Sequence, residues 1–254
     1  MRPYRRRRPG GSIRPHPSIL LLLLGVLIPL LLREPAPPAP APLPEGEVLE
    51  SVRAALPEEL EPLRRAFVES GAALAGRVGY FWGGKSDAVG WDARWGVPAV
   101  VTAPGSDTTG ESIPFGLDCS GFVSWCAVNA AGDAAAGAVI GSGVRDQWAR
   151  CTPVAWDEAQ PGDLLVFPDL SHVGIAAGRG TDGKLMVLHC SRSLGGVVCS
   201  PDARAVGFAG AGRPTIFTNT GAAGKRARSG KPLRANSLLN GIASHAPRCL
   251  LRPL

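Results

Sequence analysis

One cysteine stands where the chain would place a nucleophile. Cys119 follows an extended segment marked by Pro and Gly and precedes about ten residues whose apolar positions recur at helical spacing. The unpaired backbone N–H groups and the positive end of a helix dipole favour a thiolate, so a cysteine there is expected to have a lowered pKa. Asp118 is placed to cap the helix. The segment alone leaves two alternatives open, in which Cys119 is a small core residue or half of a disulfide.

Two histidines are placed to act on that thiol. Of the four histidines, only His172 and His189 lie away from the two ends of the chain. They stand in strand-like runs joined by a turn centred near Thr181. In an antiparallel hairpin the numbers of paired residues have a constant sum, which is about 362 for this turn, and 172 plus 189 is 361. We therefore expect cross-strand neighbours within one residue of register. One imidazole would take the thiol proton, and the other polar group would hold its tautomer and orientation.

The spacing of the cysteines argues against a metal site. The six cysteines form no CxxC pair, and Asp118 is the only further ligand expected near Cys119. We expect neither a metal nor a cofactor. Cys190 and Cys199 flank a Gly-Gly turn, so they would pair across it in an oxidising compartment or remain free thiols.

Helical and strand-like patterns surround these residues. The helices are expected over 47–56, 58–78, 120–130 and 144–150, and the strands over 164–167, 172–177, 185–189, 197–198 and 214–217. Short turns join the first three strands, so these should form an antiparallel meander with both histidines at one edge. The helix after Asp118 should bury one face.

Charge is unevenly distributed along the 254 residues. The net charge is +6, but residues 34–224 carry 13 basic and 21 acidic side chains, which leaves this part close to −8. The part that can fold therefore lacks the positive surface of a nucleic-acid-binding domain, and we expect no nucleic-acid partner. Residues 219–254 form a basic tail that is expected to be a flexible, solvated arm.

The N-terminal segment has the features of an export signal or a membrane anchor. Residues 1–33 combine seven arginines and no acid with an apolar run from Ile19 to Leu32. This run is shorter than the roughly 20 residues that span a membrane comfortably, which favours a signal peptide, whereas the prolines that follow disfavour cleavage. We expect an uncleaved anchor with an exported body, and secretion is the alternative. The Pro- and Ala-rich residues 34–46 should be an extended linker.

Four separated motifs, taken in order, resemble those of the NlpC-type cysteine peptidases of bacterial cell walls. They are Tyr80-Phe81-Trp82-Gly83-Gly84, Asp118-Cys119-Ser120-Gly121-Phe122-Val123, Pro161-Gly162-Asp163-Leu164 with His172-Val173-Gly174-Ile175, and Leu188-His189 before Gly195-Gly196-Val197. The resemblance covers residues 60–218, and we assign the catalytic domain to 47–218. It implies an α+β, papain-like fold in which N-terminal helices pack on a small antiparallel sheet.

The same resemblance implies roles for individual residues. Cys119 would be the nucleophile, His172 the base and His189 the third polar residue of the triad. The backbone N–H of Cys119 would help to hold the oxyanion. The side chains implied to line the oxyanion and substrate region are Tyr80, Trp82, Asp118 and Ser120.

The resemblance also implies a substrate and a location. The substrates would be peptidoglycan stem peptides, cleaved at the bond between D-γ-glutamate and diaminopimelate. The alternatives are an N-acetylmuramoyl-L-alanine amidase, a related acyltransferase, or a non-catalytic wall-binding protein. The protein would work in the cell envelope, held at the membrane by its N-terminal segment, and the alternative for the basic tail is binding to anionic wall polymers.

One part of the chain departs from the family pattern. Between Gly84 and Asp118 lie 33 residues, several times the usual gap, and we treat residues 85–115 as an insertion. Because it joins two motifs of the site, it should lie near the cleft. It is either a wall of that cleft or a loop that Trp91 and Trp95 pin to the core.

Overall fold

This computed structural model describes residues 38–217 of the chain. The predicted signal or anchor segment (1–33) and the basic tail (219–254) lie outside the described residues, as does the start of the linker. Within residues 38–217, no helix is long and apolar enough to cross a membrane.

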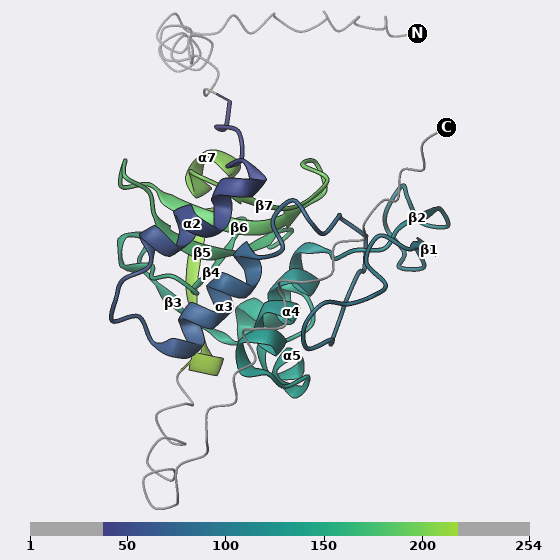
Figure 1. Cartoon of the computed structure of the whole chain (residues 1–254), viewed down its shortest axis with the longest axis horizontal. Coiled ribbons are helices and arrows are strands. Elements are labelled where there is room, and N and C mark those ends of the chain that lie inside the picture. Colours follow the sequence, from purple (N-terminus) through teal and green to yellow (C-terminus); the bar gives the residue numbers. More distant parts are fainter. Residues whose placement is uncertain (1–37, 218–254) are drawn as a thin grey trace, which may run out of the picture. The chain divides into compact units, whose positions relative to one another are not determined.

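A six-stranded antiparallel sheet forms the centre of the fold (Figure 1). Its strands are β3 (Cys151–Val154), β4 (Leu164–Val166), β5 (Val173–Arg179), β6 (Leu185–Ser191), β7 (Gly196–Ser200) and β8 (Gly210–Pro214), in the spatial order β3-β8-β4-β5-β6-β7. The predicted meander is present as β4, β5 and β6. The sequence did not predict β3, and the expected strand over 214–217 was wrong, because β8 ends at Pro214 and a 3-10 turn follows.

Helices cover the sheet. They are α2 (Glu45–Ala55), α3 (Pro62–Ala72), α4 (Cys119–Ala131), α5 (Ala135–Ile140), α6 (Val144–Ala149) and α7 (Ala203–Val206), with a 3-10 turn, η1, at Trp156–Glu158. The expected helix over 58–78 is shorter than predicted. Pro62 stands at its first position, where a missing N–H costs nothing, and the Glu61 carboxylate accepts the N–H groups of Leu63 and Arg64 as a cap.

The sheet is buried on both faces, because side chains alternate along each strand. Leu164 and Val166 join the core beneath α2, α3 and α4, whereas Leu165 joins a second core with Phe208 and Ala203 of α7. Each fully buried aliphatic side chain contributes roughly 1.5–3 kcal/mol, so both cores stabilise the sheet. The α+β fold with helices packed on a small antiparallel sheet is confirmed.

Helix α4 is the central helix of the helical layer. Residues 119–128 are all buried, so the prediction of a single buried face was wrong. The run from Cys119 to Val128 is apolar or small on every side, as expected of a helix enclosed by protein. The helix ends at Gly132, which has the left-handed conformation that a glycine adopts without strain.

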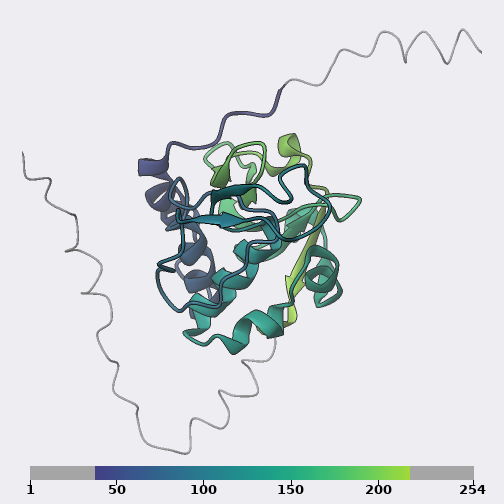
Figure 2. The same ribbon diagram turned by 90° about the vertical axis from the view of Figure 1, so that its right-hand side faces the viewer.

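The insertion is an ordered segment with its own small sheet. Strand β1 (Pro98–Val100) pairs with β2 (Ser112–Pro114), and this hairpin faces the viewer in Figure 2. Trp95 is buried and packs edge-on against Trp125 of α4, with ring centroids 5.3 Å apart. Trp91 is 52% exposed and contacts Trp95. Trp95 therefore pins the insertion to α4.

A buried ion pair joins α3 to the start of β4. Arg64 Nη1 donates to Asp163 Oδ1 at 2.8 Å and to the carbonyl of Pro161 at 2.9 Å. The Asp163 carboxylate also accepts from the N–H of Gln160 at 3.0 Å and from Arg213 at 3.3 Å. Asp163, which was identified from the sequence only as part of a family motif, thus connects a helix, a turn and a strand.

Replacing Arg64 by leucine should destabilise the fold by about 3–5 kcal/mol, because the fully buried Asp163 carboxylate loses its closest cation. Urea unfolding followed by circular dichroism measures the loss. The matched control is Arg65→Leu on the same helix, which breaks only contacts to the carbonyls of Pro57 and Glu58 and should cost less than about 1 kcal/mol. Equal losses in the two variants would contradict the assigned role of the ion pair.

Candidate functional site

Cys119 is the first residue of α4, and Asp118 caps the helix. The Asp118 carboxylate accepts the N–H of Gly121 at 2.6 Å. A side chain at Gly121 would place its Cβ 2.0 Å from the carbonyl oxygen of Gly84, so only glycine lets the Tyr80–Gly84 loop approach the helix this closely. The motif residues around Cys119 therefore have local structural reasons for their types.

The Cys119 thiol is nearly enclosed, at 9% exposed. Burial raises its pKa, and the neighbouring Asp118 carboxylate raises it further. The backbone N–H groups of Val173 and Ser120 and the Lys85 ammonium lower it, but burial outweighs them. The expectation of a lowered pKa was wrong, because the helix-terminus argument does not include the loss of solvent around the sulfur.

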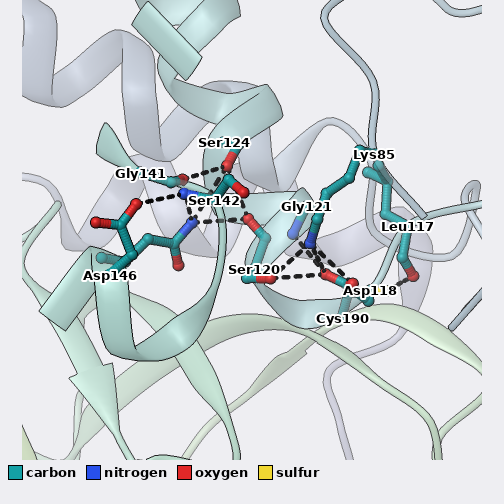
Figure 3. Close-up of polar contacts among 11 residues, drawn as sticks. Lys85, Leu117, Asp118, Ser120, Gly121, Ser124, Gly141, Ser142, Asp146 and Cys190 are labelled. Atoms are coloured by element: carbon teal, nitrogen blue, oxygen red, sulfur yellow. Dashed lines mark hydrogen bonds and ion pairs between the residues drawn. The ribbon is translucent and has the colours of Figure 1, made fainter. Parts of the chain in front are cut away.

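Lys85, the first residue of the insertion, reaches the same cluster (Figure 3). Its ammonium donates to both oxygens of Asp118, at 2.6 and 2.8 Å, and to Ser120 Oγ at 2.6 Å. Ser120 Oγ in turn donates to Asp118 Oδ1 at 2.9 Å. The polar atoms of Asp118 and Ser120, predicted to line the oxyanion and substrate region, are thus engaged with one another and with Lys85. No pattern in the sequence singled out Lys85.

Helix α6 holds the next turn of α4. The Gln147 side chain, fully buried, donates to the carbonyl of Ser120 at 2.8 Å, to Ser124 Oγ at 3.2 Å and to the carbonyl of Gly141 at 3.1 Å. These bonds tie α4 to the segments on either side of the Gly141 turn. Sequence reasoning missed Gln147, since a glutamine in a predicted short helix gives no signal of its buried contacts.

The two histidines lie side by side, as predicted, and a serine extends the pair. His172 Nε2 lies 2.9 Å from His189 Nδ1, and His189 Nε2 lies 2.9 Å from Ser200 Oγ. His189 is 1% exposed and Ser200 is equally buried. Ser200 was missed because the expected strand there covered only 197–198, whereas β7 continues to Ser200.

The register of the hairpin differs from the prediction. Ile175 pairs with Leu188, so their positions sum to 363, and an irregularity between Ala176 and Gly178 shifts the pairing further along the hairpin. Continuing the ladder puts His189 opposite Gly174, and His172 is its diagonal neighbour. A Cβ on Gly174 would lie 3.1 Å from His189 Cβ and 2.6 Å from a Val187 methyl group, so glycine leaves the space in which the imidazoles meet.

Burial keeps both imidazoles neutral. It lowers the pKa of His172 to about 4 and that of His189 to about 3, and the neighbouring His172 adds to the shift of His189. Both rings pack against Phe208, whose side chain belongs to the core on the face away from α4. A neutral imidazole carries one unprotonated nitrogen, which can accept a hydrogen bond or a proton.

The Cys119 sulfur lies beside the start of β5. The backbone N–H of Val173, the residue after His172, faces the sulfur. Among the described residues, no hydrogen bond joins the Cys119 thiol to the His172 imidazole. Catalytic hydrogen bonds are often long in the free protein and tighten in the complex with substrate.

Tyr80 also lies beside the cysteine, through a bridge that pairs it with Leu117. Burial raises its pKa, followed by the charges of Cys119 and Asp118, so its hydroxyl remains a hydrogen-bond donor. Trp82 is engaged differently. Its indole N–H donates to the carbonyl of Pro104 at 2.9 Å and holds the insertion.

An exposed ion pair links the insertion to the β6–β7 turn. Arg192 donates to the carboxylate of Asp107, and the Arg192 charge also acts on Tyr80. The insertion therefore borders the site, through Lys85 on one side and through Asp107 on the other. Of the two alternatives for this segment, the pinned loop is present through Trp95, and the same segment also reaches the residues around Cys119.

The remaining cysteines carry no bridge. All five cysteines within residues 38–217 are free thiols. Cys190 donates its S–H to the carbonyl of Leu117, and Cys199 lies opposite Leu188 in the ladder between β6 and β7. In the part of the chain that the structure describes, no three His, Cys, Asp or Glu side chains gather as a metal site would require.

The protein thus combines an α+β fold with a buried cysteine at a helix N-terminus, next to the start of a strand that a histidine precedes. The model of the NlpC/P60 family matches residues 77–205, just over half of the chain, and the chain belongs to this family. The predicted resemblance is therefore confirmed.

Solved structures give more distant likenesses. RipB of Mycobacterium tuberculosis, a peptidoglycan hydrolase, is 24% identical over 78% of this chain and 80% of its own, with a TM-score of 0.40. The P60 domain of antigen MAP1204 from M. avium subspecies paratuberculosis is 23% identical over 59% and 93%, with a TM-score of 0.40. RipD of M. tuberculosis, described as non-catalytic, is 19% identical over 60% and 97%, also at 0.40. No curated protein matches the chain.

Stability should fall as the pH drops from about 6.5 towards 4. Both buried histidines have lower pKa values in the folded state than the ordinary 6.5, so the unfolded chain binds more protons in this range. The stabilisation is complete above about pH 6.5 and is lost as the pH falls towards the folded-state values. Urea unfolding at stepped pH measures it. The variant carrying His172→Gln and His189→Gln should show a flatter decline between pH 6.5 and 5, and an unchanged decline would assign the effect to other groups.

Proposed function

We propose that this protein is a cysteine peptidase that hydrolyses peptidoglycan stem peptides, with Cys119, His172 and His189 as its triad. The observation that carries the proposal is a series of hydrogen bonds from Ser200 through His189 to His172. His172 directly precedes Val173, whose backbone N–H faces the Cys119 sulfur. Membership of the NlpC/P60 family, whose members generally act on peptidoglycan as cysteine peptidases, supports the reaction class.

The hydrogen bonds among Ser200, His189 and His172 relate the tautomers of the two imidazoles to each other. If His189 Nε2–H donates to Ser200 Oγ, then His189 Nδ1 accepts the Nε2–H of His172. Nδ1 of His172 is then left with a lone pair. This is the arrangement that a general base requires, because the free nitrogen can take the thiol proton while the second nitrogen is held.

The reaction would begin from a neutral pair. Cys119 is buried as a thiol and His172 as a neutral imidazole, so proton transfer accompanies attack of the sulfur on the scissile carbonyl. The Tyr80 hydroxyl and the backbone N–H of Cys119 would stabilise the oxyanion of the tetrahedral intermediate. The imidazolium of His172 then protonates the leaving amine as the C–N bond breaks. Water, deprotonated by His172, releases the acyl group and restores the thiol.

The bond between D-γ-glutamate and diaminopimelate is the proposed point of cleavage. The same triad would serve an N-acetylmuramoyl-L-alanine amidase or an acyltransferase, and mass spectrometry of the released muropeptides separates the three. A non-catalytic wall-binding protein is the further alternative, and RipD shows that the family includes a protein described as non-catalytic. The Cys119, His172 and His189 set favours an enzyme.

We also propose that the protein is exported and acts in the cell envelope. Its family and the apolar run in residues 1–33 support this location. The same proposal includes attachment to the membrane through that segment. For residues 219–254 it includes either a solvated arm or a contact with anionic wall polymers.

Cys119→Ala should reduce the release of muropeptides from purified sacculi by more than about 1000-fold, because the nucleophile is lost. Liquid chromatography with mass detection quantifies the products. Cys151→Ala is the matched control, since the Cys151 thiol donates to the carbonyl of Gln147, in α6, and this variant should retain activity. Release by the Cys119→Ala variant at the wild-type rate would sink the assignment.

Ser200→Ala should lower kcat on a defined muropeptide by about 3- to 10-fold, because one buried hydrogen bond that holds His189 is removed. KM should change little, since Ser200 is buried behind the histidines. The conservative Ser200→Thr variant keeps the hydroxyl and should recover part of the loss. A changed KM with an unchanged kcat would place Ser200 outside the series of hydrogen bonds to the histidines.

A further inference from the structure

The cluster of Lys85, Asp118 and Ser120 lies directly beside the proposed nucleophile, and the mechanism above does not use it. Its carboxylate is buried, and the Lys85 side chain is 39% exposed. Asp118 accepts four contacts, from the N–H of Gly121, from Ser120 Oγ and twice from the Lys85 ammonium. The three protons of the ammonium are matched by the two Asp118 oxygens and Ser120 Oγ.

We propose that Lys85 is a positioning residue for the reaction of Cys119: its ammonium holds the Asp118 carboxylate as the cap of α4 and cancels the negative charge of that carboxylate next to the sulfur. Lys85 acts through Asp118 and touches neither the sulfur nor the scissile bond. The inference rests on the role of Cys119 proposed above and adds a residue from the insertion to it.

The geometry explains why a counter-charge is needed. A carboxylate beside a cysteine opposes formation of the thiolate, and with little solvent around it that repulsion is weakly screened. Asp118 cannot be dispensed with, because it caps the helix whose first residue is Cys119. The ammonium at 2.6 Å keeps the cap and opposes the field of the carboxylate at the sulfur. The directions of the pKa contributions at Cys119 agree, since Asp118 raises its pKa and Lys85 lowers it.

Other titratable groups face the same sulfur and remain in place in every variant below. Tyr80 approaches from the preceding loop and Cys190 from β6, and both are buried enough to stay protonated near neutral pH. His172 precedes the Val173 N–H that faces the sulfur, and burial keeps it neutral. Lys85 and Asp118 are therefore the charged pair whose balance changes when either is replaced.

The test is the alkylation rate of Cys119 by iodoacetamide between pH 6 and 10, read on the Cys119 peptide by mass spectrometry so that the other thiols do not interfere. Lys85→Met should slow alkylation about three- to tenfold at pH 8 and move the profile to higher pH, because the carboxylate charge is uncovered. Lys85→Arg should recover part of the rate. Asp118→Asn should alkylate faster than wild type, and the variant with both Lys85→Met and Asp118→Asn should lie near wild type.

Arg94→Met is the matched control, because Arg94 is another cation of the insertion that binds a buried carboxylate, Asp92, away from the cysteine. It should leave the profile unchanged. If Lys85→Met fails to fold, the comparison of Asp118→Asn with the double variant still isolates the charge of Lys85, and near-ultraviolet circular dichroism reports folding in each case.

A purely structural role for Lys85 would lower the unfolding midpoint of Lys85→Met without moving the alkylation profile, and that result overturns the inference. Rates that do not depend on the variant overturn it as well. Alkylation requires no substrate, so the expected order of rates together with no release from sacculi would refute the proposed function and leave the role of Lys85 standing.

Discussion

The buried N-terminus of α4 is the constraint on which the site depends. A helix end enclosed by protein leaves N–H groups without partners unless side chains supply them, and here the Asp118 carboxylate does so. A buried carboxylate in turn requires a cation or several hydrogen bonds, which Lys85, Ser120 and Gly121 provide. Each of these residues therefore offsets the free-energy cost of burying the polar group before it. Together they hold Cys119 in one place.

Burial also sets the protonation state of the site. The same enclosure that stabilises the fold raises the pKa of Cys119 and lowers those of His172 and His189, so all three are neutral in the free protein. A preformed thiolate–imidazolium pair would be costly in this environment. In the proposed mechanism, charge would develop only during attack, where the Tyr80 hydroxyl and the backbone N–H of Cys119 would stabilise it.

The insertion contacts both the edge of the site and the residues beside Cys119. Trp95 anchors it to α4. Its hairpin β1–β2 forms a sheet separate from the six-stranded one (Figure 1), and an exposed pair between Asp107 and Arg192 joins the insertion to the β6–β7 turn. Such an exposed ion pair contributes little to stability, so this link between the insertion and the β6–β7 turn is a weak one. Lys85 begins the insertion, so this segment contributes a charge beside the cysteine.

Local rules were enough for much of the fold and of the candidate site. Helical spacing after Asp118 and the short strand-like runs follow from neighbours in sequence, and the numbering of two strands brought His172 and His189 together. The pairing sum beside the histidines is 363 rather than about 362, and His172 lies two positions from the residue opposite His189. The difference arises because an irregularity near Gly178 cannot be read from a turn signal. The residues of four short motifs, and the order of these motifs along the chain, were by themselves enough to indicate the family.

Tertiary structure decided what depends on distant contacts. Ser200, Gln147 and Lys85 carry no local signal, since they bond partners on other elements at 11, 27 and 33 positions along the chain. The sign of the Cys119 pKa shift was also decided there, because burial depends on every element packed around the sulfur. The sequence by itself determined which residues can do chemistry and the class of fold that holds them. The packing of the chain determined which of them meet and in what protonation state, because solvent exclusion and long-range contacts exist only in the folded molecule.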